Sequence, residues 1–368
     1  MIVRHLSTLP RASDQIHIII HCWLRSDPLS DLNIKFDNID DQAWVKFSSI
    51  EKFAPTLAVA IETLGMTAYL PADLQQWLRL VRDANKKRNE LILAEITQFT
   101  KILNEIDVQP CYLKGAAYLL DDLYGDIGLR FMADCDCLIP EDSIAEAHQH
   151  LLDHGYTLSA NSTQNDDDAH LPTVFSPESD FAFELHRNLS YLPPLDRSLI
   201  SAEMVLSEAS IHDRDGIKYK LPSIKHRISH LLAHATLSPA QVLRSSLYIR
   251  DLIDLDMLLR EASVHDMQRS IACFQASPIA RIRTQAALHA AARLFKTPIE
   301  DFGSISLLGR LYGQIAIIQT KSNIGKITGR FAGILAYLAG TIVQAPSSLP
   351  KTLSNITTQL AYDFDPRC

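Results

Sequence analysis

The chain has 368 residues, which is enough for two or three domains of about 150 residues each. Hydrophobic residues make up 47% and charged residues 21%, a composition that excludes a disordered tail or a collagen-like array. Lys and Arg total 35 against 43 Asp and Glu, giving a formal net charge of −8. This acidic balance argues against a protein that binds long nucleic acid through its backbone, but it is compatible with a small nucleotide held by a few basic side chains.

The six cysteines are too sparse for a disulfide framework, and no C-x-x-C motif occurs. Cys135 and Cys137 form the only close pair, and nothing else in the sequence completes a four-ligand zinc site with them. We therefore expect a reducing, cytoplasmic environment. The apolar stretch 16–24 is interrupted by His17 and His21 and is followed by no cleavage site, so no signal peptide is expected.

The longest apolar run covers residues 331–345, about 15 residues, which is short of the roughly 20 that a membrane-spanning helix requires. No membrane span is therefore expected. A G-x-x-x-G pattern at 329–333 overlaps this run, and without a span it indicates close packing between helices.

The first part of the chain, residues 1–109, is predicted to be helical. Apolar residues recur at steps of four, three and four between positions 92 and 103, so they lie on one face of a helix. The polar, basic stretch 85–89 directly before them is interpreted as a solvated helix face rather than a contact with nucleic acid.

Between residues 110 and 222 short strands alternate with helices, which predicts a sheet with helices packed on it. The predicted strands are 111–113, 131–139, 156–158 and 180–186. The predicted helices are 116–124 and 143–154, and Gly155 ends the second. His150 and His154 are spaced by four near that end, where positive charge is favourable, and are interpreted as structural. The aspartates at 166–168 are interpreted as part of a solvated loop.

From residue 223 to 368 the periodicity is helical again, over 224–236, 243–262, 278–295, 304–320 and 327–345. His226, His230 and His234 recur every four residues and share one helix face. Without an evident carboxylate or cysteine partner for zinc, they are interpreted as packing residues or as the wall of a cleft. The chain as a whole predicts an α+β fold, with a small mixed β-sheet core flanked by N-terminal and C-terminal helical regions.

The sharpest chemical signal is a pair of aspartates on a predicted strand. Asp134 and Asp136 project to one face of this strand, whereas Cys135 and Cys137 project to the other. Two carboxylates side by side on an apolar strand repel each other and lose hydration, which favours a cation between them. Oxygen ligands of this kind suit Mg²⁺ or Mn²⁺. The alternative is a strand end at which both aspartates are solvated.

Other residues place this pair in a pattern. Glu184 supplies a third carboxylate on the strand 180–186, on the face that also carries His186. Lys114 and Gly115 lie at a predicted strand-to-helix turn, where a glycine lets backbone N–H groups approach a phosphate. Lys114 and Arg130 can add positive charge beside the phosphate oxygens.

These motifs resemble the uncharacterised nucleotidyltransferase family of the DNA-polymerase-β-like superfamily. The resemblance covers roughly residues 85–260. Its centre is formed by L-K-G-A-A at 113–117, Y-G at 124–125, Arg130, D-C-D-C-L-I at 134–139 and E-L-H at 184–186. Weaker similarity extends to H-L-P at 170–172 and to the helical stretches 231–235 and 252–255.

The resemblance implies a two-metal site for nucleotidyl transfer. Asp134 and Asp136 match the paired metal ligands, Glu184 matches the third carboxylate, and Gly115 matches the glycine of the phosphate turn. Lys114, Gly115 and Ala116 stand where a Gly-Ser pair is commoner in the superfamily, so a serine contact to phosphate is missing. Lys114 is expected to replace that contact, and its removal to weaken NTP binding with little effect on stability.

The activity that the resemblance implies is transfer of a nucleoside monophosphate from an NTP, such as ATP, with release of pyrophosphate. The expected cofactor is Mg²⁺ or Mn²⁺. The family's frequent association with peptide-modification loci favours a small-molecule or peptide acceptor over an RNA end. Two alternatives stay open: a catalytically silent nucleotide- or partner-binding protein on the same fold, and transfer of another phosphate-linked group, such as a sugar phosphate.

Overall fold

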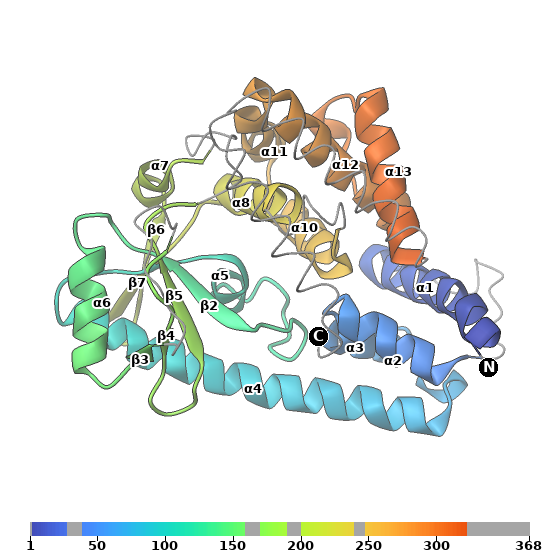
Figure 1. Ribbon diagram of the computed structural model, residues 1–368, viewed down its shortest axis with the longest axis horizontal. Helices are drawn as coiled ribbons and strands as arrows, with labels where there is room; N and C mark the ends of the chain where they lie inside the picture. Colours follow the sequence, from blue (N-terminus) through green and yellow to red (C-terminus); the bar gives the residue numbers. More distant parts are fainter. Residues whose placement is uncertain (1, 28–38, 159–169, 190–199, 239–246, 322–368) are drawn as a thin grey trace.

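The computed structural model describes residues 2–27, 39–158, 170–189, 200–238 and 247–321 (Figure 1). The predicted helix 327–345, its G-x-x-x-G pattern and the aspartates at 166–168 lie outside these residues. Within the described ranges, no helix combines the length and the apolar character needed to cross a membrane.

The N-terminal part of the chain is helical, as predicted. Its helices are α1 (Ile2–Arg25), α2 (Asp41–Ile50), α3 (Ala54–Thr63) and α4 (Ala72–Asn104), with a short 3₁₀ helix, η2 (Thr67–Tyr69), before α4. The apolar residues between 92 and 103 are buried on one face of α4, which confirms the predicted periodicity. Figure 1 shows α4 as one long helix that runs beneath the sheet at one end and beneath α2 and α3 at the other.

The interpretation of 85–89 as a solvated face was wrong for two of its residues. Asn85 and Asn89 are buried, and their side-chain amides donate hydrogen bonds to the carbonyl oxygens of Gly128 and Arg130 at 2.7 and 2.8 Å. These asparagines hold the loop that leads into the central strand. A polar helix face and a face that binds loop carbonyls look alike in sequence.

Seven strands form one mixed sheet in the order β3-β4-β5-β2-β1-β7-β6. Their bounds are β1 (Cys111–Tyr112), β2 (Asp134–Leu138), β3 (Thr157–Leu158), β4 (Val174–Phe175), β5 (Ala182–His186), β6 (Ser210–Arg214) and β7 (Ile217–Leu221). Strand β2 runs antiparallel to β1 and parallel to β5. The sheet and its flanking helices confirm the predicted α+β class.

Strand β2 is shorter than the predicted 131–139, and the register explains why. Its first residue, Asp134, pairs with Ala182, which is the first residue of β5. Before that point the carbonyl of Met132 accepts a hydrogen bond from the Arg88 guanidinium instead of from a neighbouring strand. A tertiary contact from α4 therefore replaces the first part of the predicted strand.

The hairpin of β6 and β7 was not predicted. Asp215 and Gly216 form its turn, with backbone φ angles of 57° and 81°. An Asp-Gly pair between alternating residues is a strong hairpin signal, because both positions of this turn require left-handed backbone. The signal was therefore present in the sequence.

The sheet separates two chemical environments. Cys135 and Cys137 are fully buried on one face, as predicted. On the same face Phe183 of β5 stacks on Phe99 of α4, with ring centroids 4.1 Å apart and planes at 5°. This apolar face is covered by α4 and by α6 (Ile144–Asp153). The alternate residues of β2 and β5 point to the opposite side, towards the C-terminal helices.

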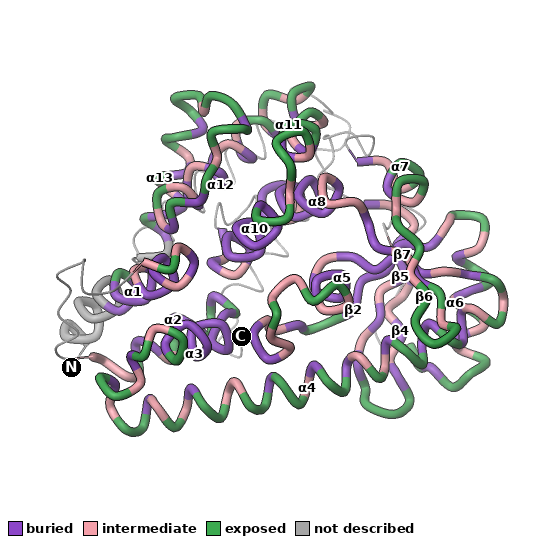
Figure 2. Tube along the Cα trace, turned by 180° about the vertical axis from the view of Figure 1, so that it is seen from behind, coloured by how far each residue is buried: buried purple, intermediate pink, exposed green. Residues whose placement is uncertain are grey.

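Those helices follow a short α5 (Lys114–Leu120) and α7 (Ala202–Ser207). They are α8 (Ile224–Leu237), α10 (Ile249–Glu261), α11 (Val264–Ala272), α12 (Pro278–Phe295) and α13 (Leu307–Lys321), with 3₁₀ helices η4 (Cys273–Ala276) and η5 (Glu300–Phe302). Helix α8 packs against α5, α10, α11 and α12, and α1 packs against α12 and α13. Figure 2 shows that buried residues concentrate in the sheet, α5, α8 and α10.

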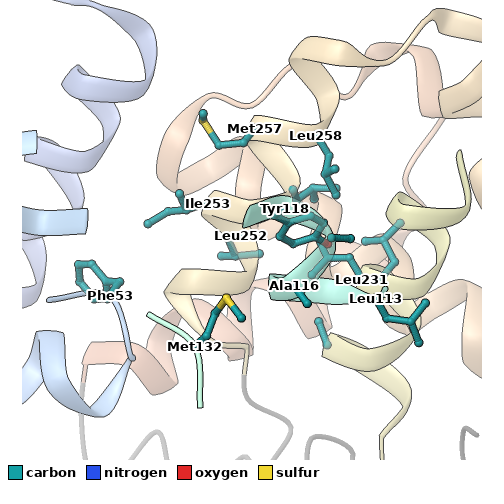
Figure 3. Close-up of a cluster of buried hydrophobic side chains, with 14 of the residues drawn as sticks. Phe53, Leu113, Ala116, Tyr118, Met132, Leu231, Leu252, Ile253, Met257 and Leu258 are labelled. Carbon is teal, nitrogen blue, oxygen red and sulfur yellow. The ribbon is translucent and has the colours of Figure 1, made fainter. Parts of the chain in front are cut away.

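An apolar cluster joins the sheet region to the C-terminal helices (Figure 3). Ala116 and Tyr118 of α5 lie among Leu252 and Ile253 of α10, with Met132 close to them. This cluster joins α10 to α5, the helix that begins at the turn carrying the predicted phosphate contacts.

Candidate active site

Asp136 is the centre of the site. Asp136 is only 3% exposed. Its Oδ1 atom lies 2.9 Å from both Lys114 Nζ and His186 Nε2. Burial alone would raise the pKa of Asp136, but the Lys114 charge and the hydrogen bond from His186 hold it well below its usual range. Asp136 is therefore an ionised carboxylate inside the protein.

Glu184 and His186 come to Asp136 from the neighbouring parallel strand. The register places Glu184 directly opposite Asp136, and His186 Nε2 lies 3.5 Å from Glu184 Oε2. One ligand atom from each of the three residues lies within 4.8 Å of the other two. The hydrogen bond with His186 lowers the pKa of Glu184. Burial would lower the pKa of His186, but its bonds to the two carboxylates raise it.

Asp134 lies at the exposed beginning of β2, one alternation before Asp136. It is not among the three residues whose ligand atoms lie within 4.8 Å of one another. Its pKa is raised, first by partial desolvation and then by the negative charge of Asp136. The structure thus brings two of the three predicted carboxylates together with an unpredicted histidine, and places the third carboxylate at the edge of the group.

Lys114 reaches Asp136 from an unusual backbone conformation. Its φ angle is +46°, in the left-handed region, directly after β1 and at the beginning of α5. This conformation is uncommon for a residue with a side chain and usually marks a position that the surrounding structure enforces. Here it turns the chain so that the ammonium group points at the next strand.

Gly115 and Ala116 are buried behind this lysine. A Cβ atom on Gly115 would lie 2.2 Å from Arg130 Nη1 and 2.9 Å from Met132 Cγ. The space that the glycine leaves is therefore taken by the Arg130 side chain. Close packing with Arg130 is a sufficient physical reason for a glycine at this position.

Arg130 is engaged with the C-terminal helices. Its Nε and Nη2 atoms donate to the two carboxylate oxygens of Asp254 at 2.9 and 2.8 Å, and its guanidinium lies over the Tyr118 ring. The side chain of Asp254 is fully buried in α10, and the hydroxyl of Tyr124 also donates to it. In this structure Arg130 joins the sheet region to α10.

Two histidines of α8, His230 and His234, face the same region. Burial lowers the pKa of His230 well below the usual range, and it lowers the pKa of His234 to about 3, with the Lys114 charge as the next cause in both. His226 is also buried, at the beginning of the helix. Among the described residues, no group of possible metal ligands includes any of these three histidines. His230 and His234 belong to the wall that α8 presents to the Asp136 group, whereas His226 shares a hydrogen bond with Ser223 at the beginning of the helix.

Replacement of His234 by glutamine is expected to reduce the acid sensitivity of the fold. Because the folded pKa of about 3 lies below the usual 6.5, the unfolded chain binds a proton that the folded chain does not, and stability falls as pH drops from 6.5 towards 3. Removal of this one titrating group should reduce the slope of the unfolding free energy against pH by about 1.4 kcal/mol per pH unit. Urea unfolding at several pH values measures this slope. An unchanged slope in His234→Gln would contradict this, and His265→Gln, at an exposed position of α11, is the control.

Sequence reasoning missed two residues of this region. His186 shares the Glu184 strand face, so the alternation E-L-H contained the signal, but no sequence feature showed that β5 pairs with β2. Asp254 is 124 positions after Arg130, in an apolar helix pattern. Aspartates at 251, 254 and 256 interrupt the leucines and isoleucines of this stretch, and nothing in that pattern singles out Asp254 as the partner of a buried cation.

The donor set fits a divalent ion. Two carboxylates and an imidazole converge, and a third carboxylate with a raised pKa stands beside them. Carboxylates of this kind suit Mg²⁺ and Mn²⁺, and Mn²⁺ also accepts an imidazole nitrogen readily. Asp134, Asp136 and Glu184 are the residues that would hold such ions, with His186 adjacent.

Comparison with known proteins agrees with this arrangement. The model of a family described as uncharacterised nucleotidyltransferase matches residues 37–296, which is more than half of the chain. The match includes the whole sheet, all the residues of the Asp136 group and helices α8 and α10. The protein is therefore a nucleotidyltransferase by class, and the chain belongs to the uncharacterised nucleotidyltransferase family. No curated protein matches the chain.

Proposed function

We propose that this protein transfers a nucleoside monophosphate from an NTP, such as ATP, to a hydroxyl group of a small molecule or peptide, and releases pyrophosphate. The observation that carries the proposal is the register of β2 and β5. It sets Asp136 opposite Glu184, with Asp134 on the same strand and Lys114 in contact. Ionised carboxylates beside a lysine are what binding of a metal–triphosphate complex requires.

The residues divide into two groups in this proposal. Asp134, Asp136 and Glu184 hold Mg²⁺ or Mn²⁺. Such ions, when bound, lower the pKa of the attacking hydroxyl and offset the charge of the leaving pyrophosphate. His186 donates to Asp136 and so orients its carboxylate. Lys114, held beside the carboxylates by its contact with Asp136, provides positive charge for the phosphate oxygens.

Gly115, Ala116 and Arg130 support this site from behind. In the proposal Gly115 and Ala116 shape the turn that presents Lys114, and Arg130 fills the space beside Gly115. The primary contribution of Arg130 is then to position the turn, through its ion pair with Asp254.

Replacement of Lys114 by alanine is expected to weaken NTP binding about tenfold to hundredfold, the equivalent of a charged contact of roughly 1.5–3 kcal/mol. The expectation that stability would hardly change does not fit the ion pair with buried Asp136, whose charge the variant leaves with fewer partners. We therefore expect a lower free energy of unfolding as well.

Calorimetric titration with a non-hydrolysable NTP and Mg²⁺ measures the affinity, and urea unfolding measures the stability. Lys87→Ala, at an exposed position of α4, is the matched control and should change neither. If Lys114→Ala binds the NTP as tightly as the unaltered protein, the lysine does not contact phosphate.

A pocket beside the loop that leads into β2 supports a small-molecule or peptide acceptor. Its volume is about 340 Å³, and its walls come from α2, α3, α4 and Phe131. Trp77 and Phe131 provide apolar area, and Arg88 and Lys52 provide positive charge. The Oδ1 atom of Asn85, another lining residue, is buried without a hydrogen-bond partner. A ligand with a flat apolar part, a hydrogen-bond donor and an anionic group fits these walls.

The experiment that tests the proposed function uses the purified chain, Mg²⁺ and each of the four NTPs in turn, with and without a cell extract. We expect release of pyrophosphate that depends on the metal, on one preferred NTP and on the added extract. Absence of pyrophosphate release with every NTP, in the presence of Mg²⁺ and extract, would contradict the proposal.

A further inference from the structure

A second group of metal-binding side chains lies on the other side of the sheet. Glu105 is the residue at the C-terminal end of α4, and His150 and His154 lie one turn apart at the end of α6. Helices α4 and α6 pack on the apolar face that Cys135 and Phe183 occupy, whereas Asp136 and Glu184 point to the opposite face. The group is therefore separate from the candidate active site.

The geometry of the three side chains is close to that of metal ligands. His150 Nε2 and His154 Nε2 lie 3.4 and 3.2 Å from the same oxygen, Glu105 Oε2. Two donors that each lie 2.0–2.1 Å from a tetrahedral zinc ion are roughly 3.3–3.4 Å apart. A direct N–H···O hydrogen bond is usually shorter, about 2.9–3.0 Å. The two nitrogen–oxygen spacings thus suit ligands of one ion, and the ligand atoms of all three residues lie within 4.8 Å of one another.

The hydrogen bonding of the two histidines also favours metal binding. His154 Nδ1 donates a hydrogen bond to the backbone oxygen of His150 at 2.8 Å, which fixes the tautomer and leaves Nε2 as the atom with a lone pair. His150 Nε2 is buried and makes no hydrogen bond. A buried ring nitrogen that makes no hydrogen bond is costly, and a metal ion would satisfy it.

We propose that Glu105, His150 and His154 form a binding site for a zinc-type divalent ion that ties the end of α4 to the end of α6. Two imidazoles and one carboxylate are a ligand set that zinc accepts, with water in the remaining position. Nitrogen ligands disfavour Mg²⁺, so the site selects a different ion from the active site. In this proposal the two histidines, which the sequence indicated to be structural, stabilise the fold as metal ligands.

The ion would stabilise the part of the fold that holds the catalytic strands. Helix α6 directly follows β2, and it also packs on β5. A metal bond between α6 and α4 therefore restrains the connection between the strand of Asp136 and the strand of Glu184. Because the ion binds the folded chain and not the unfolded one, the melting temperature should rise with zinc concentration.

The test uses the metal-free, untagged protein titrated with Zn²⁺ by calorimetry, with Tm measured at each zinc concentration. The double variant His150→Ala/His154→Ala should bind one equivalent fewer than the unaltered protein, and should lose the zinc-dependent rise in Tm. Glu105→Gln, at a side chain that is 48% exposed, should weaken the same equivalent at least about tenfold. If the double variant does not fold, the zinc affinity of Glu105→Gln serves as the test instead.

Two controls separate this site from the other one. Asp136→Asn, which alters only the active-site group, should keep the equivalent that the double variant loses. His265→Ala, an exposed histidine of α11, should bind zinc as the unaltered protein does. The proposal is overturned if the double variant, or Glu105→Gln where the former does not fold, binds zinc with unchanged stoichiometry and affinity.

Discussion

Asp136→Asn should abolish nucleotidyl transfer, with a loss of rate of at least about a hundredfold. The change keeps the shape of the side chain but removes the charge that the site is built to hold, and such charge stabilisation is worth several kcal/mol in the transition state. Asp136 is the only carboxylate of the group that contacts both Lys114 and His186. Single-turnover assays with the preferred NTP measure the loss. Asp83→Asn, at an exposed position of α4, is the control and should keep full activity.

The same variant should also be less stable at neutral pH. Two hydrogen bonds between charged groups are weakened at a buried position, a cost of about 1.5–3 kcal/mol. Because the folded pKa of Asp136 is lowered, its contribution is present above the unfolded pKa near 3.8 and is lost as pH falls through the folded value. The difference in unfolding free energy between the two proteins should therefore shrink in acid. Equal stability at pH 7 would contradict the ion-pair account.

Arg130→Met is expected to destabilise the protein by about 3–5 kcal/mol, the cost of leaving a buried charge without its partner. Asp254 is fully buried, and two nitrogens of Arg130 bond its carboxylate. The pair joins the loop before β2 to α10, so its loss also loosens the turn at Lys114. Urea unfolding followed by circular dichroism measures the change.

A compensated variant separates charge from packing. Arg130→Met combined with Asp254→Leu removes both charges and should recover most of the stability that Arg130→Met loses, because well-packed apolar residues often replace a buried pair at little cost. If instead Arg130 acted chiefly on phosphate, Arg130→Met would be nearly as stable as the unaltered protein. It would then differ only in NTP affinity.

Much of the site was predicted from the alternation of side chains along one strand. It separated Asp134 and Asp136 from Cys135 and Cys137, and the structure has both cysteines buried on the far face. Periodicity likewise identified the helices and the α+β class. These features depend on neighbours within one element, so a sequence pattern is enough to reveal them.

The features that the sequence did not reveal depend on contacts between distant elements. Only the family resemblance indicated that Glu184 joins the aspartate pair, and strand alternation did not show its register opposite Asp136. Nothing in the sequence showed that Arg130 would bind Asp254. Removal of Lys114 was expected to have little effect on stability. That expectation considered the phosphate contact alone, whereas the structure pairs Lys114 with the buried carboxylate of Asp136.

The most direct test of nucleotidyl transfer follows the two ends of the triphosphate separately. The protein is incubated with the cell extract that supplies the acceptor, Mg²⁺ and an NTP that carries a radioactive label on either the α- or the γ-phosphate. We predict that the α-label appears on the acceptor, that the γ-label appears only in pyrophosphate, and that Asp136→Asn gives neither. Label on the acceptor from the γ-phosphate, or NTP binding with no transfer of the α-label, would contradict the assignment.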